Sequence, residues 1–232
     1  NKIKGKTIIG HTRWATHGKP ILKNCHPFVK DNCALVHNGI IENYEELLKL
    51  FSINKNKIQS ETDSEIIAQV YDKLLNKYNN PIDAIINLNN KIEGTYSFAF
   101  LVKGSNSIYA TRKGSPLLLG LSNNFNSISS DVLGLPDSTK EIIFLEEDDI
   151  VEINNQKFSI LNKSGKIVKR EKHKFIPKTE FKIKGSYKHF MQKEIFHQPT
   201  SIEDTVLNFA DKKTNSIFLP KSDINFNNIS NL

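Results

Sequence analysis

The stretch Gly10-His11-Thr12-Arg13-Trp14-Ala15-Thr16-His17-Gly18 follows directly on the apolar run Thr7-Ile8-Ile9. An apolar run that breaks into a glycine-bounded segment is typical of a strand that opens into a loop. This segment holds one arginine, two histidines, two threonines and the only tryptophan of the chain. The sequence therefore predicts a strand at residues 7–9 and a functional loop after it. The alternative is that Arg13 is a surface ion-pair partner and Trp14 a core anchor.

A second polar motif follows the next apolar run. Cys33 to His37 predicts a short strand that stops at Asn38-Gly39. Asn-Gly commonly forms a tight turn, because both residues tolerate positive φ. The same geometry suits a functional role, since glycine lets a substrate approach the backbone N–H and the Asn38 carboxamide adds a second donor. Two such donors are what an oxyanion hole requires, so both interpretations stay open.

Three helices are predicted after this motif. Asn43 to Phe51 carries apolar residues at helical spacing. Thr62-Asp63-Ser64-Glu65 matches a capping box and begins a longer helix with one apolar face. Asp63 lies in its first turn, where a carboxylate stabilises a helix by ~0.3–1 kcal/mol, and spacing alone favours that role. Pro81 begins a third helix that continues through Leu88.

The spacing of the apolar residues changes from helical to strand-like at Gly94, and short strands follow in quick succession from there. Such strands pair antiparallel, and the helices cluster in the middle third, so the predicted fold class is α+β with helices layered on sheet. Lysine-rich residues 163–184, broken by Pro177, predict an extended excursion or a linker, and the helix-compatible segment 187–196 is expected to stop before Pro199. The strands are expected at residues 95–102, 107–111, 116–121, 127–129, 142–145 and 150–153.

Composition narrows the class of protein. With 232 residues, 38% hydrophobic and 25% charged, the chain can form one sizeable core or one domain plus an appendage. No apolar run approaches the ~20 residues of a membrane helix, so we expect a cytoplasmic location and no membrane partner. The net charge of +7 comes almost wholly from lysine, and no basic run is interleaved with aromatics, so we expect no nucleic-acid partner. Cys25 and Cys33 are expected to be inert, reduced thiols.

The nonapeptide at residues 10–18 resembles the glutamine-binding loop of the N-terminal-nucleophile (class II) glutamine amidotransferases. Within that family the similarity is greatest to members that transfer the ammonia to fructose 6-phosphate. The resemblance implies an αββα sandwich, incomplete at its N-terminus, over residues 1–182, and a linker at 183–232 toward sugar-phosphate isomerase domains that the chain lacks. Five more stretches match the family in order: His37 to Asn43, Ser60 to Asp63, Arg112 to Leu117, Ser129 to Asp131 and Met191 to Ile195.

The resemblance also assigns roles to single residues. Arg13 would pair with the α-carboxylate of glutamine, which suits a planar guanidinium, and Asp63 would take the α-ammonium. Asn38 and Gly39 would form the oxyanion hole. The remaining roles are structural: Trp14, Thr16 and His17 would shape the loop that closes over the substrate, while His26 and His37 would organise the strands rather than act as bases.

The nucleophile of this family is a cysteine at the mature N-terminus, and position 1 here is Asn. Cys25 and Cys33 follow the glutamine-binding loop, whereas the cysteine of the family precedes it, so neither takes over the role. We therefore expect a fragment that lacks the nucleophile and is inactive by itself.

The function implied is the glutaminase part of an enzyme that converts fructose 6-phosphate and glutamine to glucosamine 6-phosphate and glutamate. Ammonia would be released through a cysteinyl thioester, no metal or organic cofactor is implied, and the full-length enzyme would be a homodimer. One alternative is another class II amidotransferase such as amidophosphoribosyltransferase, against which Trp14 and residues 191–195 argue. The other is a non-catalytic glutamine-binding module, which would keep Arg13 and Asp63 but would not need Asn38-Gly39.

Overall fold

The computed structural model describes residues 5–13, 18–176, 184–207, 210–211 and 216–217. The chain divides into two compact units, Asn1–Pro177 and Lys178–Leu232. The expected boundary between residues 182 and 183 falls in 177–183, outside the described residues. The two units are described separately.

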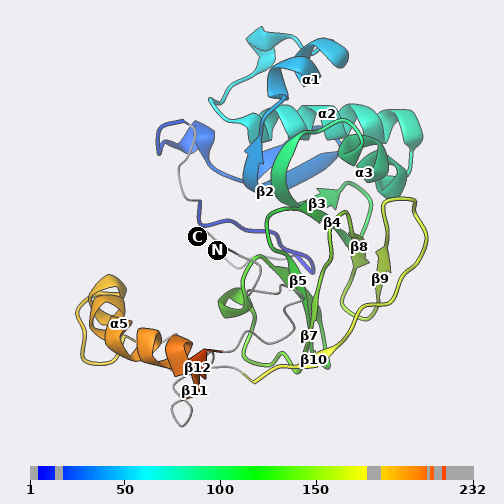
Figure 1. Ribbon diagram of the computed structural model, residues 1–232. Coiled ribbons are helices and arrows are strands. Elements are labelled where there is room, and N and C mark those ends of the chain that lie inside the picture. Colours follow the sequence, from blue (N-terminus) through cyan, green and yellow to red (C-terminus); the bar gives the residue numbers. More distant parts are fainter. Residues whose placement is uncertain (1–4, 14–17, 177–183, 208–209, 212–215, 218–232) are drawn as a thin grey trace, which may run out of the picture. The chain divides into compact units, whose positions relative to one another are not determined.

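The first unit is built on a six-stranded antiparallel sheet with the order β1-β2-β3-β4-β8-β9 (Figure 1). Its centre is the pairing of β2 with β3, which runs from Cys33 opposite Val102 to Ile41 opposite Gly94. The strands are β1 Phe28–Val29, β2 Cys33–Ile41, β3 Gly94–Val102, β4 Ile108–Lys113, β8 Ile150–Ile153 and β9 Phe158–Leu161.

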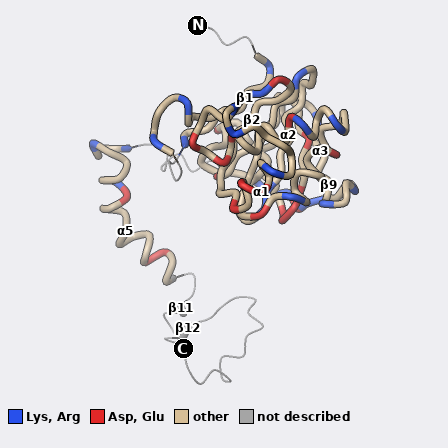
Figure 2. Tube along the Cα trace, turned by 90° about the horizontal axis from the view of Figure 1, so that it is seen from above, with Lys and Arg blue, Asp and Glu red and all other residues tan. Residues whose placement is uncertain are grey.

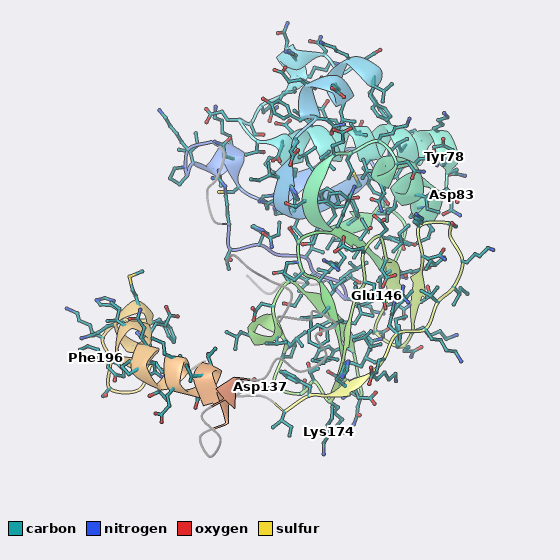
Figure 3. All side chains as sticks on the ribbon, in the orientation of Figure 1. Tyr78, Asp83, Asp137, Glu146, Lys174 and Phe196 are labelled. Carbon is teal, nitrogen blue, oxygen red and sulfur yellow. The ribbon has the colours of Figure 1, made fainter. Side chains whose placement is uncertain are left out.

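Three helices cover one face of this sheet: α1 Tyr44–Leu50, α2 Asp63–Tyr78 and α3 Pro81–Asn89. Their apolar faces and the facing strands form the largest core cluster, in which Tyr71 of α2 lies on Phe100 of β3 with ring centroids 4.0 Å apart. Figure 3 shows Tyr78 at the end of α2 beside Asp83 near the start of α3. The helices predicted at residues 43–51, 62–78 and 81–88 are thus confirmed.

A four-stranded antiparallel sheet with the order β10-β7-β5-β6 packs against the other face. Its strands are β5 Leu118–Leu121, β6 Asn126–Ser129, β7 Glu141–Phe144 and β10 His173–Lys174. Leu119 and Ile143 of this sheet share a buried cluster with Val151 and Ile153 of the first. The predicted α+β class, with helices layered on antiparallel sheet, is confirmed.

The remaining elements are short or belong to the second unit. Three single turns of 3-10 helix lie in loops of the first unit, at Leu22–Asn24, Lys55–Lys57 and Val132–Gly134. The second unit contains α5 Phe190–Leu207 and the paired β11 Ala210–Asp211 and β12 Ser216–Ile217. Phe196 on α5 is exposed (Figure 3).

Two predictions about the N-terminal strands are wrong. Residues 7–9 form no strand, since no described strand pairs with them and Ile8 is 62% exposed, although Ile9 packs against the cluster of Val36, Ala99 and Ile108. The strand that begins at Cys33 does not stop at Asn38-Gly39 but continues to Ile41. The pairing with β3 extends past both residues, and this ladder overrides the turn preference of Asn-Gly.

Two further local predictions also differ from the structure, and the structure decides a third. The capping box is not formed, since Thr62 precedes α2 without a side-chain cap, Glu65 accepts from the N–H groups of Gln59 and Ser60, and the Thr62 N–H donates to the Ser60 hydroxyl. Residues 163–176, predicted as an extended excursion or a linker, are an excursion of the first unit, since β10 pairs with β7. Helix α5 continues through Pro199, so the lost N–H of one proline weakens this helix without ending it.

Within the described ranges, no helix is long and apolar enough to cross a membrane. The same residues contain no group of three or more His, Cys, Asp or Glu side chains placed to hold a metal ion. Figure 2 shows Lys and Arg interspersed with Asp and Glu along the first unit, rather than gathered on one element.

Candidate functional site

A cavity of about 330 Å³ lies where the segment 11–13, strand β2 and the N-terminus of α2 meet. Two of its lining residues, Arg13 and Asp63, carry formal charge at neutral pH, and the others are histidines, hydroxyl and amide side chains, one glycine and the apolar Ile40. The lining therefore offers one cationic and one anionic group to a ligand. The lining residues are His11, Arg13, His26, His37, Asn38, Gly39, Ile40, Thr62, Asp63, Ser64 and Thr95.

Arg13 is held from both its main chain and its side chain. Its φ of 54° is left-handed, and its N–H donates to Nδ1 of His11 at 2.9 Å. The guanidinium donates from two nitrogens to the carbonyl oxygens of Gly18 and Lys19, each at 3.0 Å. These bonds link Arg13 to Gly18 and Lys19 and orient the guanidinium at the cavity wall.

Asp63 does more than place a negative charge at the N-terminus of α2. Its Oδ2 accepts from the N–H of Ile41 at 2.8 Å, which ties the start of the helix to the end of β2. Its Oδ1 accepts from the Ser64 hydroxyl at 3.2 Å. The carboxylate, one-tenth exposed, is therefore fixed beside the cavity by two neighbouring donors.

His37 is buried between this helix start and the aromatic core. Its Nδ1 lies 2.9 Å from the Ser64 hydroxyl, and because that hydroxyl donates to Asp63, Nδ1 is the donor. Nε2 is then an acceptor, and it has no partner among the residues described. Burial lowers the pKa of His37 to about 4, more than the nearby Asp63 raises it. The 3.9 Å approach of the two side chains is thus not an ion pair at neutral pH.

His11 and His26 are also neutral and lie side by side at the cavity. Their ring centroids are 4.4 Å apart, and the ring of His26 also meets the edge of Phe28. Burial lowers the pKa of His26 to about 3, with smaller contributions from the neighbouring histidines and Arg13. Burial and Arg13 also lower the pKa of His11. These rings supply neutral walls around Arg13, and the strand-organising role that the family resemblance implies for His26 and His37 stays a prediction.

Asn38 and Gly39 both line the cavity, but inside a strand rather than at its end. Gly39 has a φ of 137°, and a Cβ there would clash with the Thr95 carbonyl and lie 2.8 Å from Cα of Tyr96. The close approach of β3 therefore explains the glycine without any ligand. The Asn38 side chain is exposed and lines a second cavity, of about 830 Å³, as well as the first.

Neither cysteine belongs to the site. Cys33 is buried on β2, its Sγ lies 3.7 Å from the carbonyl of Ala68, and burial raises its pKa to about 12. Cys25 is exposed and its Sγ contacts the carbonyl of Ile21. Neither side chain lines either described cavity, so both thiols lie away from the candidate site, and their inert role stays a prediction.

The sequence-based site is only partly described. Arg13, Asn38, Gly39 and Asp63 come together at one cavity, whereas Trp14, Thr16 and His17 fall outside the described residues. Sequence reasoning missed five residues of the lining, His11, Ile40, Thr62, Ser64 and Thr95. Four of these stand next to or within motifs already singled out, but Thr95 reaches the site only through the pairing of β3 with β2.

Several known proteins show sequence similarity to almost the whole chain. The chain is 38% identical over 99% of its length to the glutamine–fructose-6-phosphate aminotransferase (isomerizing) of Bradyrhizobium diazoefficiens. Identity to the proteins of that name is 42% over 88% of the chain in Photorhabdus laumondii and 40% over 97% in Fusobacterium nucleatum. The matched parts cover 38%, 34% and 38% of those relatives, so the chain spans little more than a third of their length.

Among solved structures, glutamine phosphoribosylpyrophosphate amidotransferase from B. subtilis superposes with a TM-score of 0.55 over 74% of this chain and 37% of that one. The sequence identity is 21%, so this likeness concerns the fold alone. It confirms the expected αββα architecture of the class II amidotransferases. A family described as "Glutamine amidotransferase domain" matches residues 11–133, which hold the whole candidate site and more than half of the sequence, and the chain therefore belongs to the glutamine amidotransferase domain family.

Proposed function

We propose that this chain is the glutaminase part of a glutamine–fructose-6-phosphate aminotransferase and that the cavity beside α2 binds glutamine. The observation that carries the proposal is the placement of Arg13 and Asp63 on the wall of one small cavity. Free glutamine carries a carboxylate and an ammonium on one carbon, and a guanidinium and a carboxylate are their natural partners. Because the chain belongs to the glutamine amidotransferase domain family, glutamine is the α-amino acid that we propose as its ligand.

The proposed chemistry is attack on the glutamine carboxamide, with loss of ammonia. Arg13 and Asp63 would hold the amino-acid end, and the carboxamide would lie toward Asn38. As the carbonyl oxygen gains negative charge, the Asn38 side chain and the Gly39 N–H would donate to it. In the proposed thioester route the attacking group is an N-terminal cysteine of the family kind. Cys25 and Cys33 do not fit this role, because neither lines the cavity.

The proposed acceptor of the ammonia is fructose 6-phosphate, as the names of the most similar relatives indicate. Isomerase domains and a homodimer belong to this proposal, with residues 183–232 as the linker toward those domains. The sequence similarity favours this acceptor over phosphoribosylpyrophosphate, since the likeness to that amidotransferase is one of fold. A cytoplasmic location and the absence of a nucleic-acid partner stay predictions from the sequence.

Titration calorimetry of the 232-residue chain with L-glutamine tests the binding step, which needs no nucleophile. We expect saturable 1:1 binding, weakened about tenfold or more by Arg13→Lys, because an ammonium cannot reproduce a bidentate carboxylate contact. Lys172→Arg is the control, because Lys172 is exposed, directly precedes β10 and lines neither described cavity. Absence of glutamine binding would overturn the proposal. The acceptor is tested by product analysis of the enzyme carrying this chain, where phosphoribosylamine instead of glucosamine 6-phosphate would favour the alternative.

A further inference from the structure

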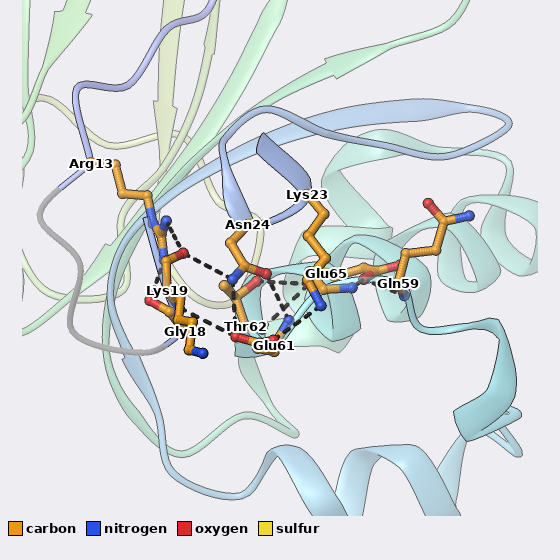
Figure 4. A network of polar contacts seen from close by, with 10 residues as sticks. Arg13, Gly18, Lys19, Lys23, Asn24, Gln59, Glu61, Thr62 and Glu65 are labelled. Atoms are coloured by element: carbon orange, nitrogen blue, oxygen red, sulfur yellow. Dashed lines mark hydrogen bonds and ion pairs between the residues drawn. The ribbon is translucent and has the colours of Figure 1, made fainter. Parts of the chain in front are cut away.

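A polar network that the proposed chemistry does not use lies behind the Arg13 loop (Figure 4). Its centre is Asn24, which is 0% exposed although its side chain is polar. Its Nδ2 donates to the Lys19 carbonyl at 3.0 Å and to Oε2 of Glu61 at 3.2 Å. Its Oδ1 accepts from the Glu61 N–H at 2.9 Å. A buried amide with its hydrogen bonds so satisfied has a strongly defined position.

On one side this network reaches the guanidinium of Arg13. The Lys19 carbonyl that accepts from Asn24 also accepts from Arg13 at 3.0 Å, and the Lys19 N–H donates to Oε2 of Glu61 at 3.2 Å. The neighbouring Gly18, whose carbonyl is the other acceptor of Arg13, packs directly on the network. A Cβ at Gly18 would lie 2.8 Å from Nδ2 of Asn24 and 3.1 Å from Cβ of Glu61.

On the other side the network ends at the chain segment that leads into α2. Glu61 stands two residues before Asp63, and Thr62 between them lines the cavity. Lys23 forms an ion pair with Glu61 at 3.0 Å, and its hydrogen bond, followed by those from Lys19 and Asn24, lowers the pKa of Glu61 to about 2. Glu61 is therefore ionised at neutral pH and accepts from both sides of the loop.

We infer that Asn24 and Glu61 are positioning residues that fix the distance between the guanidinium of Arg13 and the carboxylate of Asp63. The carboxylate and the ammonium of an α-amino acid sit on one carbon, so a clamp for both works only at one separation. Arg13 is held by hydrogen bonds to two backbone carbonyls, those of Gly18 and Lys19. The Lys19 carbonyl also accepts from Asn24, and the Lys19 N–H, which shares a peptide group with the Gly18 carbonyl, donates to Glu61. The inference rests on the proposed function and extends it to the selection of α-amino acids.

The test compares two ligands on Asn24→Asp. This variant keeps the oxygen that accepts from the Glu61 N–H but loses both donated bonds and sets a carboxylate beside Oε2 of Glu61, so the Lys19 carbonyl that accepts from Arg13 loses one of its donors and the Lys19–Glu61 contact is weakened. We expect the Kd of L-glutamine, measured by calorimetry, to rise about tenfold or more. The Kd of 4-aminobutanamide, which is glutamine without its α-carboxylate, should change less than about twofold when measured by ligand-detected NMR, because Arg13 does not contact it.

A matched control is Asn43→Asp, since the Asn43 side chain also bridges a distant carbonyl, that of Lys91, and a distant N–H, that of Glu93. Asn43 lines neither described cavity, and its variant should leave both Kd values unchanged. If Asn24→Asp fails to fold, Glu61→Ala gives the same test, because Glu61 is half-exposed and its loss leaves the bond from Asn24 to Lys19.

The outcomes separate the two hypotheses. Equal losses for both ligands would show a general loss of the site and would overturn the positioning role. Unchanged glutamine binding in Asn24→Asp would overturn it too. If the unmodified chain binds neither ligand, the proposed function falls and the positioning role falls with it. Selective loss of glutamine binding that Asn43→Asp does not reproduce supports both.

Discussion

At the scale of single residues, Asp63 has two roles that a measurement can separate. Its carboxylate accepts from Ile41 and Ser64, and it faces the cavity across from Arg13. Asp63→Asn keeps one oxygen for the Ile41 N–H but removes the charge. We expect a cost of about 1 kcal/mol or less in the free energy of unfolding. Loss of a paired charge in a closed site should weaken L-glutamine binding by about 30-fold or more.

Calorimetry with L-glutamine and urea unfolding of the same preparations check this expectation. A large loss of stability with glutamine affinity intact would show that Asp63 supports the fold and not the ligand. Ser64→Ala is the companion variant, because it removes one partner of Asp63 and of His37 but no charge.

Gly39 gives a prediction about packing alone. An alanine there would combine a φ of 137° with a clash against the β3 backbone at Thr95. We expect Gly39→Ala to lower the free energy of unfolding by about 2–4 kcal/mol, from backbone strain and overpacking together. Gly104→Ala shares a positive φ, 81°, but meets nothing within 4 Å, and should cost about 1 kcal/mol. If urea denaturation gives equal losses of unfolding free energy for the two variants, the clash with β3 does not contribute to the cost at Gly39.

At the scale of elements, an ion pair holds residues 163–176, predicted as an extended excursion or a linker, to the rest of the first unit. Arg170 donates to both carboxylate oxygens of Asp149, at 2.9 and 2.8 Å, and Asp149 is 0% exposed. Arg170→Ala would leave a buried carboxylate without its cation, which costs about 3–5 kcal/mol. The exposed pair of Lys172 with Glu141 is the control, since such pairs contribute about 0–1 kcal/mol.

Chemical denaturation monitored by fluorescence of the single tryptophan, supported by circular dichroism, measures both variants. If Arg170→Ala unfolds at the same denaturant concentration as the unmodified chain, the segment around residue 170 behaves as the expected linker after all. If Lys172→Ala loses as much stability as Arg170→Ala, the effect belongs to lysine and arginine on this segment in general rather than to the buried carboxylate.

These elements also show what the sequence could and could not predict. The helices at α1, α2 and α3 carry local signals, namely apolar spacing and a proline at the first turn of α3, and these hold without tertiary information. The path of β2 through Asn38-Gly39 depends on β3, more than fifty residues away, whose pairing no local pattern encodes. For the same reason Thr95 and the Asn24–Glu61 network could not be foreseen from motifs, whereas Arg13 and Asp63 could.

At the scale of the whole molecule, buried neutral histidines make stability depend on pH. His37 and His26 have folded pKa values of about 4 and about 3, against about 6.5 in an unfolded chain. At pH values between the folded and the unfolded pKa, the unfolded chain binds protons at these histidines that the folded chain does not bind. The free energy of unfolding should therefore be highest above pH 6.5 and fall as the pH drops toward 4, by at most about 1.4 kcal/mol per pH unit for each histidine.

The window from pH 6.5 down to about 5.5 reports mainly on the histidines, because a carboxyl with a depressed folded pKa, such as Glu61 at about 2, adds its own loss of stability only as the pH approaches its unfolded value of about 4.5. The groups facing the histidines, Asp63 beside His37 and Arg13 beside His11 and His26, do not reverse the direction, since burial dominates in both cases. Urea denaturation at half-unit pH steps measures the slope. His37→Gln should reduce the slope, because one of the three histidines with a lowered pKa, His11, His26 and His37, is gone, while exposed His173→Gln should leave it unchanged. A flat profile in this window would mean that the folded chain admits protons to these rings, and the cavity wall around Arg13 would then be charged rather than neutral.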